Sequence, residues 1–129
     1  MTPNVKYSIF LDDVRFPSDV TWVSLNFPAD KVIVRNFDQF KRTIERKGLP
    51  VFVAYDHDLS VEHYGDGLNG DNIDYSQYKE KTGFDCCKFL VEECAKKSIK
   101  HPPYVVHSMN PIGRANIESY IESYNRSLE

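Results

Sequence analysis

The sequence predicts an α/β fold in which helices cover both faces of an open parallel sheet. Two observations support this prediction. Short apolar runs rich in β-branched and aromatic residues alternate with segments of helical periodicity. The three strongest runs also lead directly into polar residues, which is typical of parallel strands whose carboxyl ends meet a ligand. The expected order is strand, loop, strand, helix, strand, helix, strand, helix.

Four strands are expected. The strongest apolar runs are Lys6–Leu11, Pro50–Tyr55 and Tyr104–Val106, and Val32–Arg35 is a fourth candidate. The segment Thr21–Leu25 is ambiguous between a short strand and a loop.

Three helices are expected from their capping residues. The first begins after Asn36 and ends before Gly48, and the second begins near Thr82. The third opens at Asn110–Pro111, a cap residue followed by proline, and runs to the C-terminus. Three cysteines lie in the second helical segment, where their spacing favours core filling over a zinc site.

Length and composition indicate one folded domain over residues 1–129. Of the 129 residues, 41% are hydrophobic and 27% are charged, and the net charge of −3 gives nucleic acid no general attraction. The longest fully apolar run, Val51–Tyr55, is far shorter than the roughly 20 residues of a membrane span. An odd cysteine count and the absence of a secretory pattern predict a cytoplasmic protein.

Residues 60–81 lack periodicity and contain Asn69–Gly70 together with Tyr64, Tyr75 and Tyr78. We expect a long loop inserted after the second buried strand, and loops of this length are usually functional. The tyrosines would suit a lid that stacks on a base, and a surface excursion without a role is the alternative.

Polar clusters follow three of the predicted strands. In chain order they are Asp12-Asp13-Val14-Arg15, Asp56-His57-Asp58-Leu59 and His107-Ser108-Met109-Asn110. If these strands are neighbours, the clusters converge at one edge of the sheet, where ligands of open parallel sheets bind.

Four carboxylates in this expected crevice, Asp12, Asp13, Asp56 and Asp58, would repel one another. Such a cluster is stable if a cation neutralises it or if one acid has a raised pKa. Oxygen-rich ligation favours Mg²⁺ or Mn²⁺, and the nearby histidines would admit a transition metal as an alternative. Taken alone, Asp12–Asp13 is equally well explained as a helix cap or a solvated turn.

The same crevice offers groups that bind phosphate. Ser108 is suited to donate a hydroxyl hydrogen bond, and Asn110 and Gly113 open a helix whose N-terminus favours anions. Gly113 would allow close approach of the anion, or would only relieve packing. Arg15 is a further clamp, or else pairs with Asp12.

Four motifs together resemble a known family. They are Leu11-Asp12-Asp13-Val14-Arg15-Phe16-Pro17, Asp56-His57-Asp58-Leu59, Thr82-Gly83-Phe84-Asp85 and His107-Ser108-Met109-Asn110-Pro111-Ile112-Gly113-Arg114-Ala115-Asn116. In order and context they resemble the cyclic-phosphate processing receiver domains, over almost the whole chain. The resemblance implies a receiver-like (flavodoxin-like) three-layer sandwich with a central parallel sheet. It also implies the processing or sensing of cyclic phosphates or cyclic nucleotides.

Ordinary response-regulator receivers are more distant in pattern. Asp12 and Asp13 match their acidic pair, Asp56 matches the phospho-accepting aspartate, and Ser108 matches the conserved hydroxyl. The fifth strand and helix, with the receiver lysine, have no counterpart here, so the resemblance does not imply a conventional phosphorelay.

The leading hypothesis is metal-dependent hydrolysis of a cyclic phosphate or cyclic nucleotide. Asp56 would join the metal ligands, while His57 and His107 would serve as general acid and general base in an order the sequence leaves open. The alternatives are a sensor that binds a cyclic nucleotide without cleaving it, and a degenerate receiver that docks to a protein partner.

Overall fold

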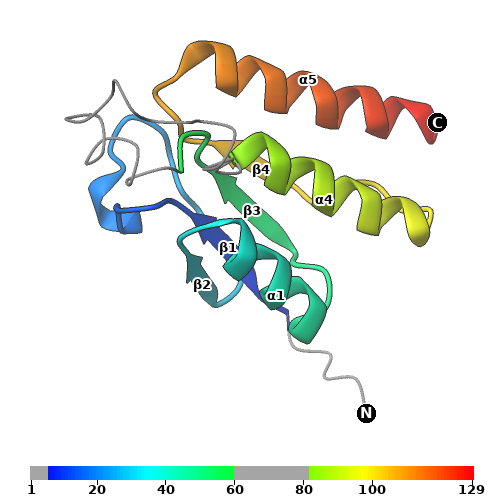
Figure 1. Cartoon of the computed structure of the whole chain (residues 1–129), viewed down its shortest axis with the longest axis horizontal. Helices are drawn as coiled ribbons and strands as arrows, with labels where there is room; N and C mark the ends of the chain where they lie inside the picture. The colour runs from blue at the N-terminus through cyan, green and yellow to red at the C-terminus, as the bar shows by residue number, and fades with distance from the viewer. Residues whose placement is uncertain (1–5, 60–81) are drawn as a thin grey trace, which may run out of the picture.

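The computed structural model describes residues 6–59 and 82–129, in which four strands form one parallel sheet (Figure 1). The strands are β1 (Ser8–Leu11), β2 (Lys31–Val34), β3 (Phe52–Tyr55) and β4 (Tyr104–Val106), in the spatial order β2-β1-β3-β4. Every neighbouring pair is parallel, and each strand lies within two residues of its predicted range. The receiver-like α/β fold class is therefore confirmed.

Three α-helices begin at the predicted caps. They are α1 (Phe37–Lys47), α4 (Gly83–Lys96) and α5 (Pro111–Ser127), and a 3₁₀-helix η1 (Pro17–Asp19) follows β1. The side chains of Asn36, Thr82 and Asn110 each accept a hydrogen bond from a backbone N–H in the first turn of their helix. At Gly48, the C-cap of α1, φ is 86°, a conformation that glycine adopts without strain.

The main core lies between the sheet and the three helices. Alternate residues of β1 and β3 face this side, with Ile9 and Tyr55 fully buried among helix residues. The helix residues of this core include Phe40, Ile44, Cys86, Cys87, Leu90, Val91, Cys94, Ile117 and Ile121. The three cysteines are unpaired and buried, as the core-filling interpretation predicted.

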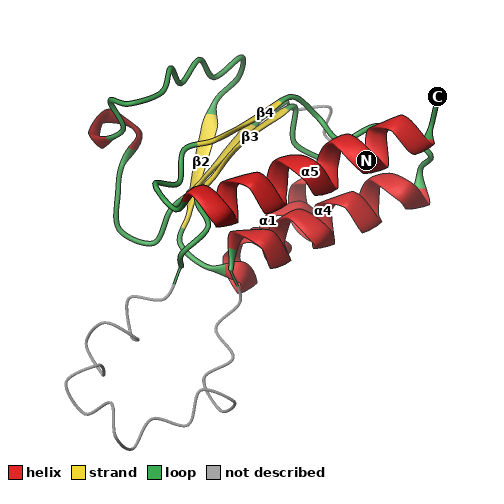
Figure 2. Ribbon diagram, turned by 90° about the horizontal axis from the view of Figure 1, so that it is seen from above, coloured by secondary structure: helices red, strands yellow, loops and turns green. Residues whose placement is uncertain are grey.

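The opposite face of the sheet differs from the prediction. We expected helices on both faces, but the three α-helices of the described residues pack on one face, and an irregular segment from Val20 to Phe27 covers the other (Figure 2). Val23, Leu25 and Phe27 pack there against Phe10 and other sheet residues. Their two-residue spacing suits an extended chain and not a helix, which also identifies the ambiguous Thr21–Leu25 segment as a loop.

Three further predictions concern a fifth strand, a membrane-spanning helix and the insertion at residues 60–81. In residues 6–59 and 82–129, β4 ends the sheet and no strand pairs with its outer edge. No helix in these residues is long and apolar enough to cross a membrane. The predicted insertion at 60–81 lies outside the described residues.

Candidate functional site

The strand register places three polar residues side by side at the carboxyl edge of the sheet. Phe10 pairs with Ala54, so two residues further along both strands Asp12 is aligned with Asp56. Tyr55 pairs with Val106, so one residue further along Asp56 is aligned with His107. The ladder continues to this level, because the N–H of Asp56 donates to Leu11 O at 3.0 Å and that of His107 to Tyr55 O at 2.8 Å. Candidate metal-ligating atoms of the three side chains all lie within 4.8 Å of one another.

Asp12 and His107 form a fully buried pair. Nε2 of His107 donates to Oδ2 of Asp12 at 3.0 Å, and Oδ1 of Asp12 accepts from the N–H groups of Val14 (3.0 Å) and Arg15 (2.8 Å). Burial by itself would raise the pKa of Asp12, but these hydrogen bonds outweigh it and lower that pKa to about 2. Asp12 is therefore a carboxylate at neutral pH.

The environment of His107 fixes its orientation. Its ring stacks on Phe10 with centroids 4.8 Å apart and planes 6° apart, and its carbonyl accepts from Nε1 of Trp22 at 2.7 Å. The other ring nitrogen, Nδ1, is buried and has no hydrogen-bond partner among residues 6–59 and 82–129. His107 is thus held behind Asp12 and exposes no surface.

Asp56 is 4% exposed and has the most perturbed carboxyl group of the site. Burial, followed by the negative charge of Asp12, raises its pKa to about 7, although its Oδ1 accepts from the N–H of His57 at 2.9 Å. Burial and the charge of Asp12 also raise the pKa of Asp13. The carboxyl groups of Asp13 and Asp56 therefore hold a proton more readily than a carboxyl group in water.

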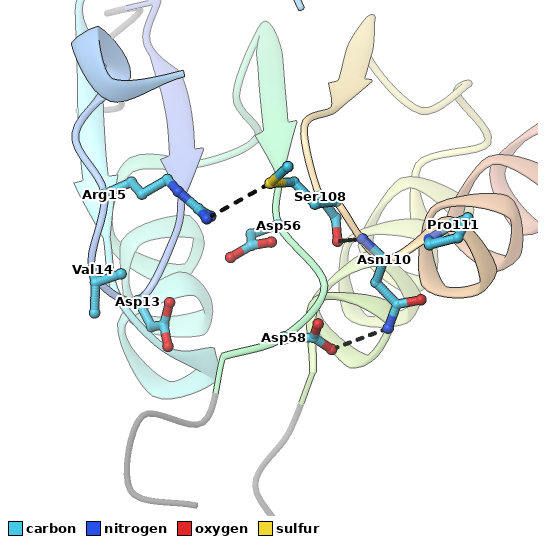
Figure 3. A pocket seen from close by; sticks show the side chains of 9 residues that line it. Asp13, Val14, Arg15, Asp56, Asp58, Ser108, Asn110 and Pro111 are labelled. Atoms are coloured by element: carbon cyan, nitrogen blue, oxygen red, sulfur yellow. Dashed lines mark hydrogen bonds between the residues drawn. The ribbon is translucent and has the colours of Figure 1, made fainter. Parts of the chain in front are cut away.

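An open cleft of about 610 Å³ lies over Asp56 (Figure 3). It is lined by Asp13, Val14, Arg15, Asp56, Asp58, Ser108, Met109, Asn110 and Pro111. Nη1 of Arg15 lies 3.6 Å from Oδ2 of Asp12, so the pairing considered from the sequence is present, and Nη2 contacts Sδ of Met109 at 4.0 Å. Figure 3 shows Arg15 and Asp13 on one side of Asp56, with Ser108 and Asn110 on the other.

Ser108 and Asn110 line the cleft and also shape the start of α5. Oγ of Ser108 accepts from the N–H of Asn110 at 3.0 Å, and Oδ1 of Asn110 accepts from the N–H of Gly113 at 2.9 Å. Nδ2 of Asn110 donates to Oδ1 of Asp58 at 3.3 Å, which links the ends of β3 and β4. The hydroxyl proton of Ser108 has no acceptor among the described residues. On this side of the cleft it is the group best suited to donate a hydrogen bond to an anion.

His57 and Gly113 lie beside the cleft and do not line it. Nδ1 of His57 contacts Oδ1 of Asp58 at 2.8 Å, and its ring packs on Gly113, where an added Cβ would come within 2.3 Å of its Cγ. Of the two alternatives for Gly113, this contact favours the packing role. His57 follows β3 one position after Asp56, so its ring lies on the helical face and that of His107 on the other.

Three residues that the sequence reasoning did not select also support the site. Nη1 of Arg35 donates to the carbonyls of Asp12 (3.0 Å) and Arg15 (2.5 Å), and Trp22 holds the end of β4. Gly83 packs so closely on β3 that an added Cβ would lie 1.7 Å from Asp56 O. Arg35 is a polar residue directly after a strand, so the rule that identified the other clusters would also have found it.

The donor set fits a hard divalent cation. Asp13, Asp56 and Asp58 line the cleft, and a carboxylate oxygen of Asp12 lies within 4.8 Å of one of Asp56. Carboxylate oxygens are preferred ligands of Mg²⁺ and Mn²⁺, and such an ion would offset the burial and the charge of Asp12 that raise the pKa values of Asp13 and Asp56.

Comparison with known proteins agrees with this architecture. No curated protein and no solved structure matches the chain significantly. One protein family, described as the cyclic-phosphate processing receiver domain, matches residues 7–123 of the 129-residue chain. The match includes every strand and the residues of the cleft. The chain therefore belongs to the family of cyclic-phosphate processing receiver domains.

Proposed function

We propose that this protein hydrolyses a cyclic phosphate ester, such as a cyclic nucleotide, in a reaction that depends on Mg²⁺ or Mn²⁺. The observation that carries the proposal is the charge of the cleft. Asp13, Asp56 and Asp58 line it, and Arg15 is its one cationic side chain among the described residues. An anionic phosphate would be repelled by these carboxylates unless a divalent cation were bound with it.

Asp13 and Asp56 would hold the ion, with Asp12 or Asp58 completing the ligand set. When bound, the ion would polarise the phosphate P–O bonds and lower the pKa of a bound water. Arg15 and Ser108 would bind non-bridging oxygens at the two sides of the cleft. Asn110, held by Gly113, would orient the start of α5 toward the same oxygens.

We expected His57 and His107 to act as acid and base, and we now propose a proton transfer for His57 alone, because His107 is buried and does not line the cleft. His107 is buried, so its part would be to hold a proton on Nε2 against Oδ2 of Asp12 and thereby fix that carboxylate. His57 is the imidazole nearer to solvent, with a side chain that is 17% exposed and an Nδ1 in contact with Asp58 at the cleft rim. It is therefore better placed to protonate a leaving oxygen.

Phosphorus NMR tests this proposal directly. The metal-free protein would be incubated with a panel of cyclic mononucleotides and dinucleotides, with and without Mn²⁺. We expect new phosphate-ester resonances from at least one compound in the presence of Mn²⁺, loss of this activity in Asp56→Asn, and retention in Glu92→Gln, an exposed acidic residue of α4. Turnover that persists in EDTA would refute the role of the metal.

A binding module is the second candidate, because no histidine lines the cleft within the part of the chain that the structure describes. In the same spectra, a sensor would broaden or shift the resonances of one cyclic nucleotide and produce no new ones. That result would replace hydrolysis with sequestration as the function of the cleft.

A further inference from the structure

A second binding surface follows from the open edge of the sheet at β2. In the described sheet β2 is an outermost strand and pairs with β1 alone (Figure 1). The carbonyls of Asp30 and Val34 accept from β1, from Ser8 N at 2.7 Å and Asp12 N at 3.1 Å. Because successive peptide groups of a strand point to opposite sides, the N–H and C=O of Ile33 point away from β1 and are available to another strand.

A shallow groove of about 310 Å³ lies along this edge, between β2 and α1. Its floor and one side come from Val32, Ile33 and Val34, and its other side comes from Gln39, Arg42, Thr43 and Arg46 of α1. These helix residues are three or four positions apart and so share one face. Oε1 of Gln39 accepts from the N–H of Arg35 at 2.7 Å, which closes the groove at the end of β2.

The charge of the groove indicates what it would bind. Arg42 and Arg46 are exposed, and neither has a hydrogen bond or ion pair with any residue in the described parts of the chain. Arg15, Arg35 and Arg114, by contrast, all have such partners. The residues that line the groove include no acid. Within the described residues, two guanidinium groups without a partner therefore flank the outward N–H and C=O of Ile33.

From these observations we propose that the groove binds an extended acidic peptide segment of another protein, which adds to β2 as a further strand. The peptide backbone would pair with the N–H and C=O of Ile33, which is the usual mode of strand addition. Every second side chain of the peptide would face α1, so carboxylates at alternate positions would reach Arg42 and Arg46.

A second copy of this chain is a poorer occupant. Two copies that paired through their β2 edges would form a symmetric interface and bring Arg42 and Arg46 of each copy toward those of the other. Like charges at such an interface oppose association. The proposal does not depend on the chemistry of the cleft, because the two sites share no lining residue.

The experiment uses a fluorescein-labelled peptide of sequence Glu-Val-Glu-Val-Glu-Val and the full chain, with binding followed by fluorescence polarisation. We expect saturable binding that weakens at least tenfold in Arg42→Gln/Arg46→Gln. The matched control, Lys97→Gln/Arg126→Gln, removes two exposed cations elsewhere and should change the affinity less than twofold. A peptide N-methylated at alternate amides should also lose at least tenfold, because it cannot pair with an edge strand.

Other outcomes would overturn the proposal. No saturable binding below about 1 mM would exclude the site at any useful affinity. Binding that survives N-methylation would be ionic attraction without strand addition. A dimer in light scattering that Ile33→Pro converts to a monomer would identify a second copy as the occupant. Ile33→Pro removes an outward N–H and also a side chain that packs against the core on the second face, so circular dichroism would first establish that the variant is folded.

Discussion

Among the carboxyl groups of the site, Asp56 has the surroundings that most disfavour its ionised form. It is buried at the end of β3 beside Asp12, whose pKa is lowered to about 2 and which is therefore ionised throughout the physiological range. Asp56, with a pKa raised to about 7, titrates near neutrality. A carboxyl group in this state binds either a proton or a cation, and the cleft above it gives both access.

The first prediction concerns the stability of Asp56→Asn. Between pH 3.8 and about 7, the Asp56 carboxyl group keeps its proton in the folded protein and has lost it in the unfolded chain. The stability of the wild-type protein therefore falls as the pH rises through this range. In EDTA at pH 8 we expect the variant to be more stable, by up to about 4 kcal/mol for a shift of this size. At pH 4 the two proteins should have nearly equal melting temperatures. Asp58→Asn at the exposed rim is the control, and an equal gain there would contradict this account.

The second prediction concerns the buried Asp12–His107 pair. His107→Ala leaves the Asp12 carboxylate without its side-chain partner and removes a ring that stacks on Phe10, so we expect a loss of roughly 3–5 kcal/mol in the free energy of unfolding. In His107→Gln, the amide can replace Nε2 as a donor, and part of the loss should be recovered. Urea denaturation measures both variants, and equal stabilities would show that the hydrogen bond to Asp12 contributes little.

At the scale of elements, helices α4 and α5 begin directly against the end of β3. The N–H of Gly83 donates to His57 O at 2.7 Å, and Gly113 supports the His57 ring. Two glycines thus set how closely two helices approach the cleft. They differ in what an added Cβ would meet, which is backbone at Gly83 and a movable side chain at Gly113.

The third prediction uses this difference. Gly83→Ala would place Cβ 1.7 Å from Asp56 O, and we expect severe destabilisation or failure to fold. Gly113→Ala should destabilise by a smaller amount, and the further change His57→Ser should recover most of it because it removes the ring that clashes. Melting temperatures of the single and double variants complete the cycle. Additive losses in the 57/113 pair would show that this contact does not limit helix packing.

Much of the arrangement of elements was predictable from local signals. The apolar runs predicted the four strands, and Asn36, Thr82 and Asn110 predicted where the three described helices begin. The layer over the second face was not predictable, because Val20–Phe27 has no periodic pattern longer than a few residues. Its side chains are held there by Phe10 and Phe52, which are distant in the sequence.

The residues of the site were predictable, but the face of the sheet on which each side chain lies was not. Parallel strand ends meet at one edge, so the convergence of Asp12, Asp56 and His107 followed from the predicted fold. Which side chains share a face depends on register, and a shift by one residue reverses every side chain. The alignment of Tyr55 with Val106 places His57 and His107 on opposite faces of the sheet.

At the scale of the whole molecule, two buried groups act in opposite directions on stability. Burial lowers the pKa of His101 to about 4, and this residue contacts the hydroxyl of Tyr55 at 2.7 Å in the main core. The unfolded histidine gains its proton near pH 6.5, so stability falls as the pH decreases from there toward 4. Asp56 has the opposite slope over nearly the same range.

The fourth prediction follows from this opposition. Between pH 4 and 6.5 the wild-type melting temperature in EDTA should change little, because the two contributions offset each other. In Asp56→Asn the larger of the two carboxyl contributions, those of Asp56 and Asp13, is removed. The histidine contribution should then dominate, and the melting temperature should rise by several degrees across the same interval. A flat profile in the variant would show that His101 is not the opposing group.

The proposed activity requires that the cleft bind one divalent cation. Calorimetric titration of metal-free protein with Mn²⁺ at pH 7.5 tests it, since the carboxylates of Asp13 and Asp56 are the proposed ligands. We predict one ion per chain in the wild type and in Glu92→Gln, and at least a hundredfold weaker binding in Asp13→Asn/Asp56→Asn. Unchanged Mn²⁺ affinity in that double variant would contradict the claim.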